Sequence, residues 1–164
     1  MHRKNKMGVA RAGFGDFYMS ERPELILYGM ELSGHTHRVV LLLEMLGMSY
    51  RFVPAPAQVR QSAEFLRLNP LGQIPVLLDG TLAVADSNAI LVYLVKRYAT
   101  DGRWMPADAI AASKLQRWLS IAAGEIRYGP ATARAKALWD MPGDRDAAIE
   151  TAGRLLRFMD IHLN

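Results

Sequence analysis

The strongest structural signal in this chain is the stretch QIPVLL at residues 73–78, which is followed eight residues later by Asp86-Ser87. Proline lacks a backbone N–H, so it belongs at the start or the edge of a strand. If the Ile74–Pro75 bond is held cis, it makes a tight, fixed corner. That corner would let the main chain of Ile74 pair with an extended peptide, while Asp86-Ser87 could hold a charged amino group. The pattern indicates a peptide-sized ligand beside a sheet. The alternative is an ordinary loop-to-strand proline followed by a helix cap.

Apolar patterns around this stretch predict the element order β-α-β-α-β-β-α. The first two strands are joined by a crossover helix and should be parallel, whereas Asp79-Gly80 is a strong signal for an antiparallel hairpin between the last two. This is a thioredoxin-like α/β arrangement, with a four-stranded sheet covered by helices. The expected elements are strands at 25–28, 50–53, 74–78 and 81–85, and helices that begin at Ser33-Gly34, Ser62 and Ser87.

The rest of the chain divides into an N-terminal extension and a helical C-terminal part. Residues 1–23 are rich in glycine and show no sustained apolar period, so we expect a flexible extension. Residues 24–100 make the thioredoxin-like domain, and Thr100-Asp101-Gly102 reads as a linker. Residues 101–164 show only helical periodicity. One helix is expected over 108–129, stopped by Gly129-Pro130, and another over 145–163, capped by Asp144.

Composition narrows the function classes. The 164 residues include no cysteine, so disulfides, thiolate metal sites and a nucleophilic cysteine are excluded, and any thiol must arrive with a ligand. The net charge is +4, but the basic residues are spread along the chain and many lie near acids. This is typical of solvated faces and argues against nucleic acid as a partner. No apolar run is long enough to cross a membrane and no signal-peptide core is seen, which predicts a cytoplasmic protein.

Three segments in order carry a resemblance to a known family. They are Leu27-Tyr28 leading to Ser33, the run NPLGQIPVL at residues 69–77, and DSNAI at residues 86–90. Together they resemble glutathione S-transferases. The resemblance implies an enzyme of detoxification that activates the thiol of glutathione for attack on a hydrophobic electrophile or a peroxide. It also implies a homodimer, with glutathione as co-substrate and no further cofactor or metal.

The resemblance places the glutathione site residue by residue. Ile74 would offer its N–H and C=O to the cysteinyl part of glutathione, with Pro75 cis. Asp86 and Ser87 would bind the γ-glutamyl carboxylate and amine at a helix N-terminus, where unpaired N–H groups favour anions. Two further residues, Gln73 and His35, with Arg38 as another candidate, would lie near the glycyl end or the thiol.

Ser33 takes the place of the catalytic serine in this resemblance. Its hydroxyl would donate to the sulfur of glutathione and, together with the helix N-terminus, would favour the nucleophilic thiolate. A plain N-cap is the alternative role for Ser33. Tyr28 could replace it as the hydroxyl donor, but its place within a strand favours packing. His35 and His37 lie two residues apart and do not share a helix face, which argues against a metal site.

Residues 101–164 depart from the family pattern. The second domain of the family is normally well over a hundred residues and contains a buried helix with a capping box, which has no counterpart here. We therefore expect an incomplete all-α domain, with apolar surface left open to self-association. Glu125, Arg127 and Tyr128 could line a pocket for the electrophile. Two alternatives stay open, namely a glutathione-binding protein without turnover and a dimerisation module with a vestigial site.

Overall fold

The structure is a computed structural model, and it describes residues 24–99, 101–139 and 143–164. The predicted extension and Thr100 of the predicted linker lie outside the described residues. Within the described part, no helix is both long enough and apolar enough to span a membrane.

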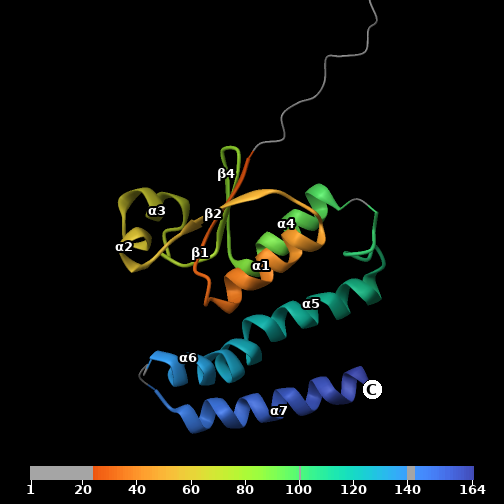
Figure 1. Cartoon of the computed structure of the whole chain (residues 1–164). Helices are drawn as coiled ribbons and strands as arrows, with labels where there is room; N and C mark the ends of the chain where they lie inside the picture. The colour runs from red at the N-terminus through yellow and green to blue at the C-terminus, as the bar shows by residue number, and fades with distance from the viewer. Residues whose placement is uncertain (1–23, 100, 140–142) are drawn as a thin grey trace, which may run out of the picture.

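A four-stranded sheet with the order β2-β1-β3-β4 forms the first half of the molecule (Figure 1). β1 is parallel to β2 and antiparallel to β3, and β3 and β4 form an antiparallel hairpin. The predicted thioredoxin-like topology is confirmed. The strands are β1 (Leu25–Gly29), β2 (Tyr50–Pro54), β3 (Val76–Asp79) and β4 (Leu82–Ala85).

Helices cover both faces of this sheet. α1 (Gly34–Met45) and α4 (Ser87–Tyr98) lie together on one face, and α2 (Ala57–Arg60) and α3 (Ala63–Leu68) lie on the other (Figure 1). The larger core forms between the sheet and the α1–α4 pair, where Leu27, Leu43 and Leu94 are fully buried. A smaller core around Phe65 and Val76 lies beneath α3. The helix α2 was not predicted.

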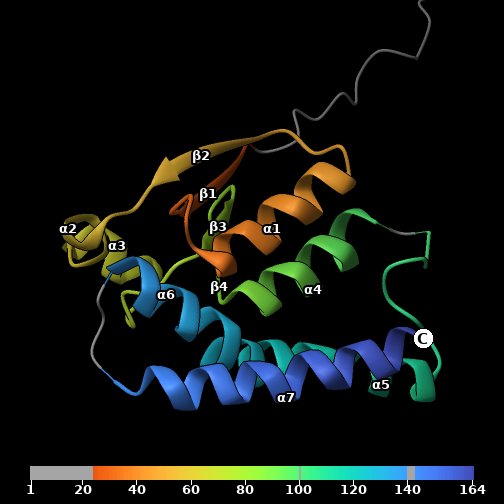
Figure 2. The same cartoon turned by 60° about the horizontal axis from the view of Figure 1, so that its bottom comes forward.

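The C-terminal part is an arm of three helices and a π-helical turn. They are α5 (Ala109–Ala123), the π-turn η1 (Arg127–Ala131), α6 (Thr132–Trp139) and α7 (Arg145–Leu163). Asp144 caps α7 as predicted, because its carboxylate accepts a hydrogen bond from Ala147 N at 3.0 Å. The chain turns back so that α7 packs along η1 and α6 (Figure 2). The rings of Trp118 in α5 and Phe158 in α7 lie 5.7 Å apart.

The predicted stop at Gly129-Pro130 was wrong. α5 ends six residues earlier at Ala123, and Gly129-Pro130 lies inside η1, from which the chain continues directly into α6. Proline cannot donate an intrahelical hydrogen bond, and its ring crowds the preceding turn. The π-turn accommodates this because Thr132 N donates to the carbonyl of Arg127, five residues back. Gly129 is buried, and a Cβ there would lie 2.9 Å from Ala152 N, so the glycine permits close packing on α7.

Candidate functional site

Sheet register brings the candidate residues to one edge of the sheet. Val76 pairs with Ala85, so Pro75 lies beside Asp86, at the point where β4 passes into α4. Val76 also pairs with Tyr28, so the end of β1 and the loop to α1 adjoin the same corner. The N-termini of α1 and α4 meet here, since His35 Nδ1 lies 3.3 Å from Ser87 Oγ.

The loop before β3 is held by a buried asparagine. Asn69 Nδ2 donates to the carbonyl of Gln73 at 2.9 Å, and its Oδ1 accepts from Leu71 N at 3.1 Å. The Ile74–Pro75 bond is cis, as predicted. Within the described residues, the N–H and C=O of Ile74 have no hydrogen-bond partner. They are therefore available to the main chain of a bound peptide, while Gln73 is exposed at the rim.

Asp86, and not Ser87, caps α4, which corrects the predicted cap by one residue. The carboxylate of Asp86 accepts from Asn88 N at 2.9 Å and from Ala89 N at 3.0 Å. Asp86 has a φ of 75°, which is unusual for a residue with a side chain and stores backbone strain. In this conformation the carboxylate can turn back over the first turn of the helix. Ser87 is buried instead, and its N–H stays without a partner among the described residues.

Cationic groups surround the imidazole of His35. Burial lowers its pKa below the usual value, and the nearby charges of Arg38 and Arg127 lower it further, whereas Asp86 opposes them. His35 is therefore neutral at pH 7. Of the three residues expected near a second pocket, Arg127 is thus close to His35, although Glu125, Arg127 and Tyr128 are all exposed. Sequence reasoning missed Arg134, whose Nη1 donates to the carbonyl of Leu32 at 3.1 Å.

Ser33 is the N-cap of α1. Its Oγ accepts a hydrogen bond from Thr36 N at 3.3 Å, and the side chain is half-buried beside the β1–α1 loop. Because Oγ is the acceptor in this bond, its own hydrogen can still be donated to a ligand. The ring of Tyr28 instead packs edge-on against Phe65, with centroids 5.8 Å apart, which agrees with a packing role.

Asn88 is a further residue at the site whose contacts were not foreseen. Its Oδ1 accepts from Arg38 Nη1 at 2.7 Å, and its Nδ2 donates to the carbonyl of Leu119 at 2.8 Å. It thereby links α1, α4 and α5 directly behind the Asp86 cap. The only sequence signal was its place in the DSNAI segment. The described residues contain no cluster of three or more His, Asp or Glu that could hold a metal ion.

Comparisons with known proteins bear on this arrangement. Residues 23–96 match the family model of the glutathione S-transferase N-terminal domain. This part of the chain belongs to the glutathione S-transferase family. The match spans the sheet, the Ile74–Pro75 corner and most of α4, so the resemblance predicted from the sequence is confirmed.

Individual relatives of this glutathione S-transferase domain extend the comparison. Glutathione S-transferase 3 of Zea mays is 37% identical over 99 residues, covering 59% of this chain and 45% of the maize protein. A solved glutathione S-transferase of Xanthobacter autotrophicus superposes with a TM-score of 0.74 at 25% identity, covering 85% of this chain and 70% of that one. A glutathione transferase homologue of Drosophila mojavensis, solved with bound glutathione, gives 0.69 at 28% identity, covering 79% and 62%. The chain spans less than half the length of the curated relatives it matches.

Proposed function

We propose that the protein is a glutathione transferase. The main support is that three groups with unused hydrogen-bonding capacity lie together at one edge of the sheet. They are the main chain of Ile74, the N-terminus of α4 at Ser87 and the hydroxyl of Ser33. An extended tripeptide with a carboxylate at one end and a thiol in the middle matches this set. Binding of glutathione to a structural neighbour supports the assignment.

The proposed binding mode follows from these groups. Ile74 pairs with the cysteinyl residue of glutathione, and the γ-glutamyl carboxylate accepts from the N–H of Ser87, where the helix N-terminus favours an anion. The carboxylate of Asp86 pairs with the γ-glutamyl amine. Gln73 and the neutral His35 lie at the two flanks of the bound peptide. The rest of the assignment, a homodimer and a hydrophobic electrophile as second substrate, stays a prediction.

The chemistry assigned to Ser33 is thiolate activation. Its hydroxyl donates to the sulfur, and the positive end of α1 adds to the effect, so the thiol loses its proton more readily. The thiolate then attacks an electrophilic carbon, a C–S bond forms and the leaving group departs with its electron pair. With a peroxide, the sulfur attacks one oxygen, an S–O bond forms as the O–O bond breaks, and the alkoxide takes a proton from water and leaves as the alcohol. A second glutathione then attacks the resulting sulfenic acid, which gives glutathione disulfide and water.

Replacing Ser33→Ala tests the catalytic role. We expect turnover with glutathione and a chlorinated aromatic acceptor to fall by about tenfold or more, while the dissociation constant of glutathione changes little, because one hydrogen bond to a charged sulfur is lost. Loss of the cap alone costs about 1 kcal/mol of stability. Ser62→Ala is the matched control, since Ser62 caps α3 through the same kind of bond to Phe65 N at 3.2 Å. Full activity in Ser33→Ala would overturn the assignment.

Replacing Asp86→Ala tests the binding mode. We expect glutathione affinity to fall by about tenfold or more in calorimetry, because the amine loses its charged partner and the cap is removed. Asp144→Ala is the matched control, because it removes the equivalent cap of α7, remote in sequence from the clamp. Unchanged glutathione affinity in Asp86→Ala would refute the clamp.

A glutathione-binding protein without turnover is the second candidate, and the observed capping role of Ser33 favours it. In that case wild-type protein binds glutathione in calorimetry, yet it transfers no acceptor, and Ser33→Ala changes only stability. A chain that binds no glutathione at all would fit only the dimerisation module.

A further inference from the structure

β2 is an outer strand of the sheet, and its far side pairs with no other strand (Figure 2). Ala55 N donates to the carbonyl of Gly29 at 2.8 Å, which fixes the residues of β2 that face β1. Because main-chain groups alternate along a strand, the N–H and C=O of Tyr50 and Phe52 point outward. Within the described residues these groups have no hydrogen-bond partner. Pro54 also faces outward but has no N–H, so it ends this open row.

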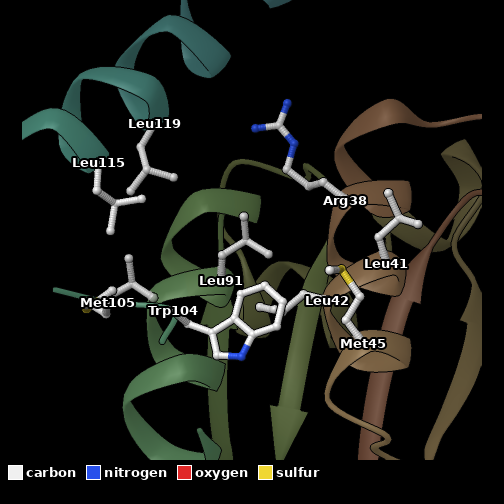
Figure 3. Close-up of a pocket in the computed structure, with 10 residues that line it drawn as sticks. Arg38, Leu41, Leu42, Met45, Leu91, Trp104, Met105, Leu115 and Leu119 are labelled. Carbon is white, nitrogen blue, oxygen red and sulfur yellow. The ribbon is translucent and has the colours of Figure 1, made fainter. Parts of the chain in front are cut away.

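A pocket of about 290 Å³ adjoins the open row. It exists because helices cover β1 better than β2: alternate residues of β1 are buried, whereas none of β2 is. The pocket is lined by Tyr50 and Phe52 of β2, by Thr36, His37 and Val40 of α1, and by Glu31 from the loop before α1. α1 turns a different face, with Arg38, Leu41 and Met45, to the separate pocket near α5 (Figure 3).

Glu31 brings an unpaired negative charge to the pocket beside β2. It is exposed, and no basic side chain of the described residues lies within ion-pair distance of its carboxylate. A second carboxylate, that of Glu44, accepts a hydrogen bond from Tyr50 OH at 3.4 Å. Burial and, to a smaller extent, the charge of Glu44 raise the pKa of Tyr50, so its hydroxyl stays a donor. Acids beside aromatic rings favour a cation, and a planar guanidinium can both pair with a carboxylate and stack on a ring.

We propose that the outer edge of β2 docks an extended, arginine-containing segment of a partner protein, with the arginine side chain in the adjoining pocket. The segment adds a strand antiparallel to β2. Residues directly opposite each other in an antiparallel pair share one face of the sheet. An arginine opposite Phe52 therefore exchanges two main-chain hydrogen bonds with it and directs its side chain toward Glu31. The pocket shares none of the residues assigned to glutathione, so the proposal stands or falls separately from the transferase assignment.

Calorimetric titration with a seven-residue peptide of valine and threonine around one central arginine tests the charge. We expect affinity at pH 8, where an ordinary histidine is neutral, to fall about tenfold or more when citrulline replaces the arginine. Glu31→Gln should erase this difference. Glu64→Gln is the matched control, because it removes an exposed acid from α3 on the other face of the sheet and should keep the difference. No binding of the arginine peptide, equal affinity for both peptides, or an arginine preference retained in Glu31→Gln would overturn the proposal.

Methylation of single peptide nitrogens tests the strand pairing while the protein stays unchanged. We expect N-methylation of the arginine to lower affinity at least about fivefold, because it removes the N–H that bonds to Phe52. N-methylation of the next residue should have little effect, since that N–H points away from β2. Equal losses from the two methylations, or competition between the peptide and glutathione, would contradict pairing at this edge. So would sedimentation in which the peptide dissociates a dimer, because a second copy would then occupy the edge.

Discussion

Asp79 shows how one buried side chain fixes the position of the candidate site. It lies at the end of β3 and accepts hydrogen bonds from Tyr93 OH at 2.6 Å and from Tyr98 OH. Both tyrosines belong to α4, so a single carboxylate ties the hairpin to the helix whose other end carries Asp86. Burial and, to a smaller extent, the hydrogen bond to Asp79 raise the pKa of Tyr98 to about 12. The tyrosine is therefore retained in its protonated, donating form.

Removing this hydroxyl should change both stability and its pH dependence. Tyr98→Phe should lower the free energy of unfolding by about 1–3 kcal/mol near pH 8, because a bond to a charged acceptor is lost. Tyrosine ionises near pH 10 in the unfolded chain and near pH 12 in the folded one, so wild-type stability falls as pH rises between these values. The difference between wild type and variant should thus shrink from pH 10 to pH 12, as urea unfolding can measure.

Tyr128→Phe is the control for this measurement, because Tyr128 is exposed and its hydroxyl has no hydrogen-bond partner in the described part of the chain. The free energy of unfolding of Tyr128→Phe should match that of the wild type at every pH. A gap between wild type and Tyr98→Phe that stays constant up to pH 12 would contradict the role given to this hydroxyl.

At the scale of elements, the sequence predicted best those features that depend on residues close together in the sequence. Asp144 caps α7 as expected, and Ser33 and Ser62 cap the helices predicted to begin at them, since each cap needs only a side-chain oxygen within reach of its own helix. Gly47 and Gly80 have positive φ values of 63° and 59°, as a helix stop and a hairpin turn require. The cis bond before Pro75 and the place of Asp86 beside it followed instead from the family resemblance.

The elements that sequence reasoning missed depend on contacts made elsewhere in the fold. Gly129-Pro130 has the local chemistry of a helix stop, yet Gly129 is retained within a π-turn because α7 packs against it. α2 is a helix of four residues, too short to show a period. The N-cap of α4 is Asp86 and not Ser87, because Asp86 adopts a positive φ that the sequence alone does not indicate.

On the scale of the whole molecule, hydrogen bonds from Asn88 and Arg134 join the helical arm to the sheet domain. Asn88 in α4 donates to the carbonyl of Leu119 in α5, and Arg134 in α6 donates to the carbonyl of Leu32 before α1. The pairs are 31 and 102 residues apart in sequence, so no local pattern could have revealed them. Both contacts end beside the candidate glutathione site. The arm therefore restrains the loop and the helix N-terminus that carry Ser33 and Asp86.

Asn88→Asp isolates the first of these contacts. The remaining oxygen still accepts from Arg38, but the second oxygen now faces the carbonyl of Leu119, where the amide nitrogen had donated at 2.8 Å. We expect stability to fall by about 1–3 kcal/mol, offset in part by an added negative charge near the start of α4. Hydrogen exchange should quicken across α5, while the strands of the sheet keep their protection.

Gln116→Glu is the matched control, because it makes the same amide-to-acid change on the exposed side of α5, where Gln116 Nε2 donates to Ser120 Oγ at 3.3 Å. Faster exchange of α5 in both variants would mean that any new negative charge loosens this helix. Faster exchange in Asn88→Asp alone, together with weaker glutathione binding, would mean that the arm holds the site in shape. Unchanged α5 exchange in Asn88→Asp would show that packing around Trp118 and Phe158 secures the arm without the polar link.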